Sequence, residues 1–336
     1  MVFVTGGTGL LGSHLLVELT KQHDTITAIY RDKDKIKTVK ACFKYYLKKD
    51  YKDYFKKIKW EECDLLDIPR LEDKMKGHKI VYHCAAIVSF ARQDFNKMME
   101  INRYGTANVM NIALDFGVEK LCYVSSTAAV GNKDIPSHEE ITENGKWVLT
   151  DETSGYSIAK YSAEKEVWRA IQEGLNAVIV NPSVIIGAGD WDESSMRIFK
   201  TIKKGMPFYS PGANSFVDAR DVSKIMVELM NKETFGERFL LTGANETFKN
   251  FFQLIAEKLD KKPAKLKLSK FIMGLTWRLS VAWAFITFSK PSITKEVARS
   301  SFNVSKYSNA KITKTLNHTF YDLEEMVENA IKGRLD

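Results

Sequence analysis

The 336-residue sequence predicts an α/β fold with a doubly wound parallel sheet and a smaller, mostly C-terminal α/β domain. Over residues 1–181, short runs of apolar and β-branched residues alternate with longer helical patterns. Strands separated by helices imply right-handed βαβ units, and therefore a parallel sheet with helices on both faces. After Pro182 this alternation loosens, and glycine and proline become denser through residues 187–212. We therefore expect one domain over 1–181 and a second mainly over 182–336, with residues about 214–243 returning to the sheet.

Seven strands are expected, because seven short segments are apolar and rich in β-branched or aromatic residues. They are residues 1–7, 25–31, 58–64, 79–86, 120–126, 176–182 and 238–243. Helical patterns fill the intervals, with start or stop signals such as Pro69 before a short helix and Gly117 after a long one. The expected helices include 12–22, 96–117, 155–173, 248–259, 269–288 and 322–332.

Composition and charge are those of a globular protein with a small anionic ligand. The chain is 44% hydrophobic and 27% charged, which is ordinary for a globular domain. Its net charge is +8, but apart from runs at 31–40, 44–59 and 261–270 the lysines are spread along the chain. We interpret them as solvated helix faces together with a site for an anionic small molecule, and we expect no nucleic-acid partner.

The cysteines and the N-terminus indicate a reducing compartment. Cys42, Cys63, Cys84 and Cys122 are scattered without a CxxC pair, so we expect neither disulfides nor a metal site. The chain opens directly in a strand, so no signal peptide is expected and a cytoplasmic location follows.

The most apolar stretch is residues 271–288, with Arg278 near its middle. Its length reaches only the lower limit for a helix that crosses a bilayer, and the arginine argues against a membrane-spanning helix. We expect a buried or interfacial helix, with peripheral membrane contact as the minor alternative.

A glycine-rich motif, "VTGGTGLLGSHL", follows the first strand and opens the first helix. Gly6, Gly9 and Gly12 permit a tight turn and let backbone N–H groups approach a pyrophosphate. The helix N-terminus adds a complementary dipole. In this strand–loop–helix setting the motif predicts dinucleotide binding by a Rossmann-type sheet.

The end of the second strand predicts which dinucleotide binds. An NAD site usually has an acid there, whereas this chain has Tyr30 and Arg31, with Asp32 just beyond. Arginine binds phosphate in a bidentate manner, so we infer NADP(H) rather than NAD(H), with Arg31 on the 2′-phosphate. The alternatives are NAD(H) binding and a merely solvated arginine. Three nearby lysines are candidates to assist: Lys33, Lys35 and Lys37.

Tyr156 and Lys160 stand four residues apart in "YSIAK", so they share one face of a predicted helix. Taken alone, this pair favours an ordinary amphipathic helix, because many surface helices carry such a pair by chance. Tyr161 is rotated by about 100° from Tyr156 in helix geometry and is interpreted as structural.

The ordered motifs together resemble the extended short-chain dehydrogenase/reductases. The residues that carry the resemblance are "TGGTGLLG" at 5–12, "DLLD" at 64–67, "HCAA" at 83–86, "IN" with "GTANV" at 101–109, "VSS" at 124–126, "YSIAK" at 156–160, "NPSVIIGAG" at 181–189 and "FVDARDVS" at 216–223. "AIYRD" and "PSITKEVARSSFNVSKYSNAKI" are similar to the dihydroflavonol reductase-like and 3β-hydroxysteroid dehydrogenase-like branch.

The resemblance implies that Tyr156 is the catalytic acid/base and Lys160 its partner. A free phenol titrates at about pH 10, and a cation one helical turn away would lower that pKa. Counting five residues back from Gly131 selects Ser126 as the third member, with Thr127 as the alternative. Val130 stands where the family often has an aromatic residue, so nearby substrate contacts are expected to differ.

The remaining implied roles lie at strand ends and on helices. Asn102 would bind backbone and hold a water near Lys160, whereas His83 is interpreted as a buried structural histidine. Asp218 and Asp221 are interpreted as structural, Asp221 as a helix cap. Asp64 would bond the adenine amino group, and Pro182, Ser183 and Val184 would lie beside the nicotinamide. The implied cofactor contacts are Gly6, Thr8, Gly9, Leu10, Leu11, Gly12, Arg31, Asp64, Leu65, Cys84, Ala85, Ala86, Ser125, Tyr156, Lys160, Pro182 and Val184.

The sequence therefore predicts an NADP(H)-dependent oxidoreductase that interconverts a carbonyl and a secondary alcohol on a small, apolar or ring-shaped substrate. The alternative is an NAD-dependent nucleotide-sugar epimerase with transient cofactor reduction. A dehydratase is disfavoured, because Thr127 and Ala128 stand where that class often has Asp-Glu. The resemblance also leaves open a homodimer formed through helices 91–114 and 155–173.

Overall fold

The computed structural model describes residues 1–131, 135–136, 138–287 and 294–335. Its centre is a seven-stranded parallel sheet in the order β10-β6-β5-β4-β1-β2-β3. The strands are β1 Val2–Thr5, β2 Ile26–Tyr30, β3 Ile58–Glu62, β4 Ile80–His83, β5 Lys120–Val124, β6 Ala177–Pro182 and β10 Glu237–Leu241. The edge strand β10 pairs with β6 although it comes much later in the chain. The predicted fold class and all seven predicted strands are confirmed.

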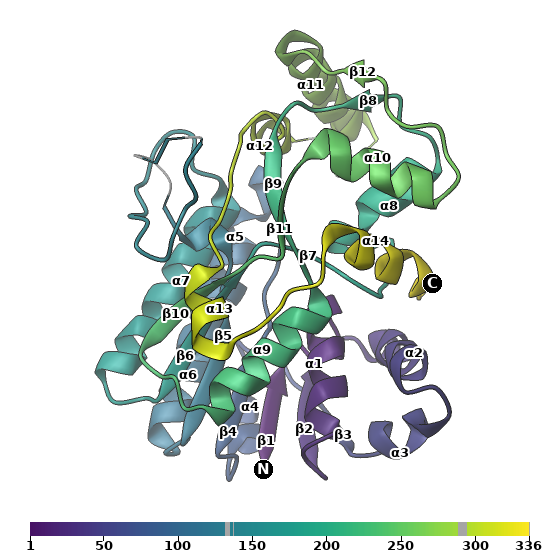
Figure 1. Ribbon diagram of the computed structural model, residues 1–336. Coiled ribbons are helices and arrows are strands. Elements are labelled where there is room, and N and C mark those ends of the chain that lie inside the picture. The colour runs from purple at the N-terminus through teal and green to yellow at the C-terminus, as the bar shows by residue number, and fades with distance from the viewer. Residues whose placement is uncertain (132–134, 137, 288–293, 336) are drawn as a thin grey trace.

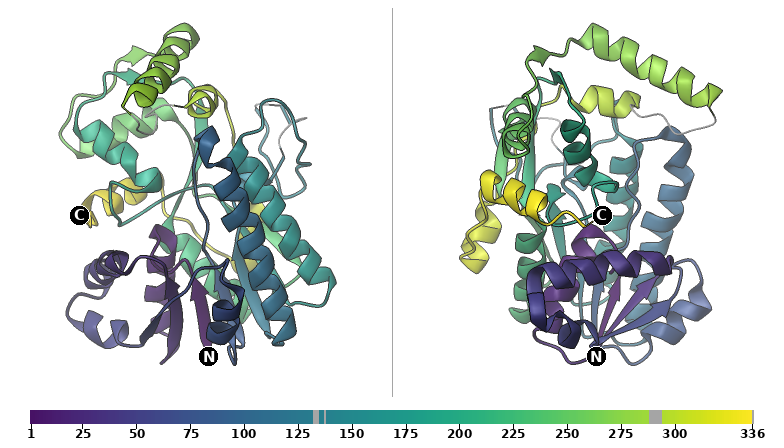
Figure 2. Two further views of the ribbon diagram at one scale, coloured as in Figure 1. Left: turned by 180° about the vertical axis from the view of Figure 1, so that it is seen from behind. Right: turned by 90° about the vertical axis from the view of Figure 1, so that its right-hand side faces the viewer.

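Helices cover both faces of this sheet, as the front and rear views show (Figures 1 and 2). One face carries α1 Leu10–Thr20, α2 Ile36–Leu47, α3 Tyr51–Phe55 and α9 Ala219–Asn231, and the other carries α4 Ile68–Met75, α6 Gly105–Asp115 and α7 Gly155–Gln172. Each set of helices seals a separate apolar core against the buried strands. Such double coverage explains why the strands are nearly continuously hydrophobic.

The long helix predicted over 96–117 is interrupted. A short α5, Phe95–Met98, continues into a π-helical segment, Met99–Tyr104, and then into α6. π-Helical turns are rare and occur frequently at functional sites. The segment contains the predicted site residue Asn102.

A second lobe lies over the carboxyl ends of the large sheet (Figure 1). It contains a three-stranded sheet, β11-β9-β7, with its own aromatic-rich core. Its elements are β7 Val184–Ile186, α8 Arg197–Lys203, β8 Phe208–Tyr209, β9 Ala213–Asp218, β11 Ala244–Thr247, α10 Phe248–Lys258, β12 Leu266–Lys267, α11 Lys270–Ile286, α12 Lys295–Ser300 and α14 Leu323–Lys332. A further helix, α13 Ala310–Leu316, packs against β10.

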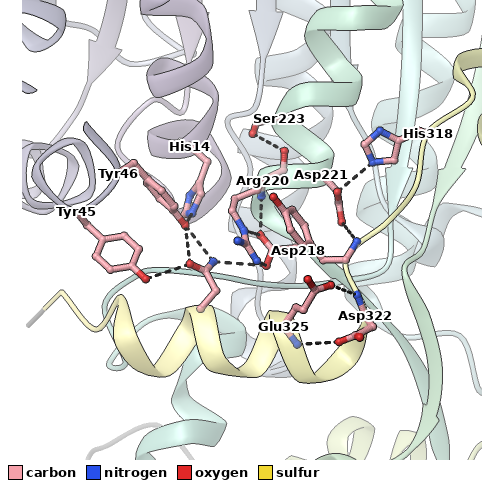
Figure 3. Close-up of polar contacts among 12 residues, drawn as sticks. His14, Tyr45, Tyr46, Asp218, Arg220, Asp221, Ser223, His318, Asp322 and Glu325 are labelled. Carbon is pink, nitrogen blue, oxygen red and sulfur yellow. Dashed lines mark hydrogen bonds and ion pairs between the residues drawn. The ribbon is translucent and has the colours of Figure 1, made fainter. Parts of the chain in front are cut away.

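A polar network joins the lobes (Figure 3). Asn329 of α14 donates to the hydroxyl of Tyr46 on α2 at 3.0 Å and to Asp218 at 3.4 Å. Asp218 also caps α9 by accepting from the Arg220 N–H at 2.8 Å. The prediction that Asp221 is the cap is therefore wrong. Its carboxylate instead accepts from the ring of His318 and from the Tyr321 N–H, because α9 packs against that later segment.

The apolar stretch at 271–288 forms α11 as far as Ile286, and residue 288 lies outside the described residues. Among the helices that the structure describes, none is both long and apolar enough to cross a membrane.

Candidate functional site

The loop between β1 and α1 has the shape of a phosphate cradle. Gly6 has φ of +68°, and a Cβ there would lie 2.5 Å from the backbone nitrogen of Ala85. A Cβ on Gly12 would lie 2.1 Å from the Gly6 carbonyl oxygen, so the loop and helix approach too closely for a side chain. α1 starts after the exposed Gly9 without a side-chain cap. The first-turn N–H groups, including those of Leu10 and Leu11, are thus available to an anion, which fits a dinucleotide pyrophosphate.

At the tip of β2, the Arg31 guanidinium lies 3.8 Å from the Asp64 carboxylate, and both side chains are about half exposed. Asp64 also accepts from the Leu66 N–H at 2.9 Å, which holds the turn after β3. Two of the three predicted helper lysines are engaged elsewhere: Lys35 pairs with Glu193 and Lys37 with Asp34. Arg31 and the exposed Lys33 therefore remain as cations beside the predicted adenosine end.

Tyr156 and Ser126 meet at the carboxyl end of β5. Tyr156 lies in the first turn of α7, which Ser154 caps by accepting from the Ser157 N–H at 3.1 Å. Ser126 caps the short turn Thr127–Ala129, and its hydroxyl accepts from the Ala128 N–H at 3.1 Å. Burial raises the pKa of Tyr156 above its usual value of 10.0, while a hydrogen bond with the Ser126 hydroxyl acts in the opposite direction. The phenol is therefore protonated at neutral pH.

Lys160 is buried and hydrogen-bonded to the strand that precedes Ser126. Its ammonium donates to the Val124 carbonyl at 2.9 Å and to the Tyr123 hydroxyl at 3.1 Å, both on β5. Burial lowers the pKa of Lys160 to about 8, although nearby Glu164 raises it. The raised pKa of Tyr156 arises from burial, which the Ser126 hydrogen bond opposes, and the effect of Lys160 on Tyr156 stays a prediction.

The other hydroxyl groups near Tyr156 are hydrogen-bonded or stacked against other partners. Thr127 is buried and hydrogen-bonds the Tyr307 hydroxyl. Ser125 donates to Glu164 at 2.5 Å, so its side chain faces the interior, and only its backbone is left for a cofactor contact. Tyr161 stacks on Trp147 with ring centroids 4.0 Å apart, away from Tyr156. Ser126 is thus the hydroxyl that the structure leaves beside Tyr156.

Glu164 is a site residue that sequence reasoning missed. Its buried carboxylate accepts from Ser125, from Asn181 at 2.7 Å, from Trp168 at 3.2 Å and from Arg238 at 3.1 Å. Asn181 also donates to the Ser126 carbonyl at 3.0 Å, so the network supports the backbone under the predicted active-site serine. The signal was the continued spacing of four after Tyr156 and Lys160.

Asn102 fixes the loop that follows β4. Its amide oxygen accepts from the Ile87 N–H at 2.7 Å and its nitrogen donates to the Ile87 carbonyl at 2.9 Å. This is the backbone contact expected of Asn102, made with a loop that also carries Cys84, Ala85 and Ala86. Farther along the same loop, Phe90 packs edge-to-face against Tyr156 with ring centroids 5.7 Å apart. The loop thus places one aromatic side chain, Phe90, beside Tyr156, and we call this ring the aromatic wall of the site.

His83 lies in a buried chain of polar groups. It contacts the Thr5 hydroxyl at 2.6 Å and the Thr106 hydroxyl at 2.9 Å, and Thr106 in turn hydrogen-bonds Tyr123. Burial lowers the pKa of His83 to about 3, so the ring is neutral. The chain leads from Lys160 to the fully buried Thr5 rather than to solvent. These contacts agree with a structural histidine and give no route for a proton shuttle.

The predicted nicotinamide end contains buried polar atoms that lack partners. Among the described residues, these include Asn181 Oδ1 and Ser183 Oγ, at the end of β6. Pro182 closes that strand, and the partly exposed Val184 opens β7. Buried polar atoms without partners are costly in the free protein, so their presence fits a bound polar group such as a carboxamide. Asp64 and Leu65 follow β3 at the far end of the same sheet edge, and the Gly6 loop follows β1 in between.

The fold and the site together define an NAD(P)-dependent enzyme of the extended short-chain dehydrogenase/reductase type. The defining features are the parallel sheet, the glycine cradle after its first strand, and a serine, a tyrosine and a lysine at the centre of the sheet. The chain belongs to the NAD dependent epimerase/dehydratase family, whose model matches residues 2–241. The resemblance stated from the motifs is thereby confirmed.

Similar proteins include both reductases and epimerases. Sterol demethylase protein B of Methylococcus capsulatus is 29% identical over 80% of this chain and 78% of its own length. A putative dihydroflavonol 4-reductase of Synechocystis is 30% identical over 66% of this chain and 60% of its own length. Among solved structures, gox2253 has a TM-score of 0.79 and 27% identity, covering 98% of this chain and 96% of its own. UDP-glucuronic acid 4-epimerase from Bacillus cereus in complex with NAD has a TM-score of 0.72 and 16% identity, covering 98% and 96%, and shows likeness of fold alone.

Proposed function

We propose that this chain is an NADP(H)-dependent oxidoreductase that interconverts a carbonyl and a secondary alcohol on a small, apolar or ring-shaped substrate. The observation that carries the proposal is Arg31 at the tip of β2, which is half exposed and lies 3.8 Å from the Asp64 carboxylate. A guanidinium in this place suits a 2′-phosphate, whereas an NAD site would favour an acid. The aromatic wall of Phe90 beside Tyr156 supports an apolar or ring-shaped substrate.

The residues present have distinct tasks in this reaction. When bound, the cofactor supplies or accepts the hydride at the substrate carbon. Tyr156, protonated at neutral pH, donates its phenolic proton to the carbonyl oxygen during reduction and takes a proton back during oxidation. Ser126 donates a hydrogen bond to the same oxygen and stabilises its developing negative charge. Lys160 provides a cation under the site and can bond the nicotinamide ribose, while Asn102 fixes the loop that carries Phe90.

The second candidate is an NAD-dependent nucleotide-sugar epimerase. The fold-level likeness to NAD-bound epimerases favours it, because the same tyrosine chemistry would serve a transient oxidation. An epimerase must keep its cofactor through the cycle and is expected to retain NAD tightly. The proposed reductase instead exchanges NADP(H) at every turnover.

The test is to denature the purified protein and identify any dinucleotide released by chromatography. We expect an empty site that binds added NADPH and oxidises it in the presence of apolar ketones. Stoichiometric release of NAD, together with no oxidation of added NADPH, would contradict the proposed reductase and favour the epimerase.

A further inference from the structure

Helix α11 carries a stripe of large apolar side chains that face solvent. Phe271, Leu275, Leu279 and Trp283 are 83%, 53%, 61% and 68% exposed. They are spaced by four residues, so they follow one side of the helix. Isolated exposed apolar residues are ordinary, but a continuous stripe on one element marks an interaction surface.

The opposite side of α11 is attached to the protein. Met273 and Ala284 are buried, and the helix packs against α12. The right-hand view in Figure 2 shows α11 extended along the outer end of the second lobe, far from the N-terminus. The helix is therefore fixed on one side and presents its apolar stripe outward.

The segment that carries the stripe has charge of one sign. Residues 261–287 contain no aspartate or glutamate. Their six cations are all exposed, namely Lys261, Lys262, Lys265, Lys267, Lys270 and Arg278. The five lysines lie between residue 261 and the first residue of the helix. The Arg278 guanidinium lies over the ring of Trp277, 4.7 Å from the ring centroid. Such long side chains can keep their charged ends at a lipid headgroup layer while their stems cover apolar surface.

We propose that residues 261–270 and the outward face of α11 dock this enzyme on an anionic lipid surface, with the helix lying in the plane of the interface. Apolar side chains on one face combined with a cluster of lysines are the features of interfacial helices. A second copy of the chain is a poorer occupant, because two-fold pairing would bring the same cationic segments together. The helix that supports α11 also contacts the active-site helix, since Glu296 of α12 accepts from the Gly155 N–H at 3.3 Å.

The first experiment measures flotation of the full chain with vesicles of phosphatidylcholine mixed with phosphatidylserine, and with phosphatidylcholine alone. We expect binding to the mixed vesicles, little binding to neutral ones, and weakening by added salt. The double variant Leu275→Glu with Leu279→Glu should lose binding, because both charges would enter the apolar layer. The matched control is Ile68→Glu, an exposed apolar residue at the start of α4, where binding should be unchanged.

A second pair of variants tests the charge. Replacing Lys265, Lys267 and Lys270 by glutamine should weaken binding to mixed vesicles by about a hundredfold, since each lysine near an anionic surface contributes roughly fivefold. The control replaces Lys44, Lys49 and Lys52 by glutamine. These three exposed lysines lie in α2, in the turn after it and in α3, and their loss should leave binding within about twofold. Circular dichroism confirms that each variant is folded.

Three results would overturn the proposal. The first is wild-type protein that binds neither kind of vesicle. The second is a Leu275/Leu279 double variant that binds mixed vesicles as well as wild type does. Sedimentation without lipid could also show a dimer that this variant converts to a monomer, which would assign the face to a second copy of the chain.

Discussion

The ammonium of Lys160 on α7 donates a hydrogen bond of 2.9 Å to the Val124 carbonyl on β5, and so ties the active-site helix to the central sheet. Tyr123 supplies a second acceptor from the same strand. Lys160 is therefore a buried cation held by two acceptors of β5. The arrangement has a measurable consequence for stability.

Stability should depend on the charge of Lys160 at alkaline pH. Its pKa is lowered from 10.5 in the unfolded chain to about 8 in the folded protein. Between these values the unfolded state binds more protons, so the free energy of unfolding should rise with pH as the buried amine loses its charge. Denaturant titrations of wild type and Lys160→Met at pH 7.5 and 10.5 should give a relative gain for wild type of about 3 kcal/mol. A pH-independent difference between the two proteins would contradict this assignment.

Turnover should depend on the Tyr156 hydroxyl. Tyr156→Phe removes the proton donor but keeps the ring that packs on Phe90, so kcat should fall by about 10²–10⁴-fold with little change in cofactor affinity. Tyr161→Phe is the matched control, because that ring stacks on Trp147 outside the site. Equal kcat values for the two variants would remove Tyr156 from the mechanism.

The Glu164 carboxylate should support both stability and catalysis. Glu164→Gln places an amide against four hydrogen-bond donors and leaves the largely buried Arg238 without its counterion. We expect a loss of about 3 kcal/mol in the free energy of unfolding, and a lower kcat because Asn181 also holds the backbone of Ser126. Glu166→Gln breaks ion pairs with the half-exposed Arg103 and Arg169 and should cost less than about 1 kcal/mol. Similar urea midpoints for the two variants would show that the buried network contributes little.

The glycine cradle should be intolerant of a single methyl group. Gly6 and Gly117 both have positive φ, of +68° and +59°, but only at Gly6 would a Cβ meet backbone atoms. Gly117→Ala should therefore cost about 1–2 kcal/mol of stability and leave cofactor binding intact. Gly6→Ala should be more destabilising and should abolish dinucleotide binding. Unchanged NADPH affinity in Gly6→Ala would mean that the dinucleotide binds elsewhere.

The architecture was predictable because its signals are local. Apolar strand segments, the glycine loop and the Tyr156–Lys160 spacing can each be recognised within a short window. The direction of Lys160 and the network around Glu164 were not predictable, because they depend on partners from other strands. Glu164 and Arg238, for example, are 74 residues apart and meet only because β10 returns to pair with β6.

The short strands of the second lobe escaped prediction for a related reason. β7, β8 and β12 have only two or three residues each, too few to establish an alternating pattern. The cap of α9 was misassigned by one turn, since Asp218 and Asp221 are both reasonable caps in sequence. The sequence left open whether α11 is buried or interfacial, because hydropathy alone does not separate a buried helix from one that presents its apolar side to the outside.

Cofactor preference is the most direct test of the central claim, that this family member is an NADP(H)-dependent reductase. The measurement is binding of NADPH and NADH to wild type and to Arg31→Ala, each at low and high salt. Wild type should prefer NADPH, and the variant should lose about ten- to a hundredfold in NADPH affinity while NADH binding hardly changes. Added salt should reduce the preference of wild type for NADPH over NADH, because salt screens the contact between a half-exposed arginine and a phosphate. A wild type that prefers NADH, or equal weakening of both cofactors in the variant, would contradict the account.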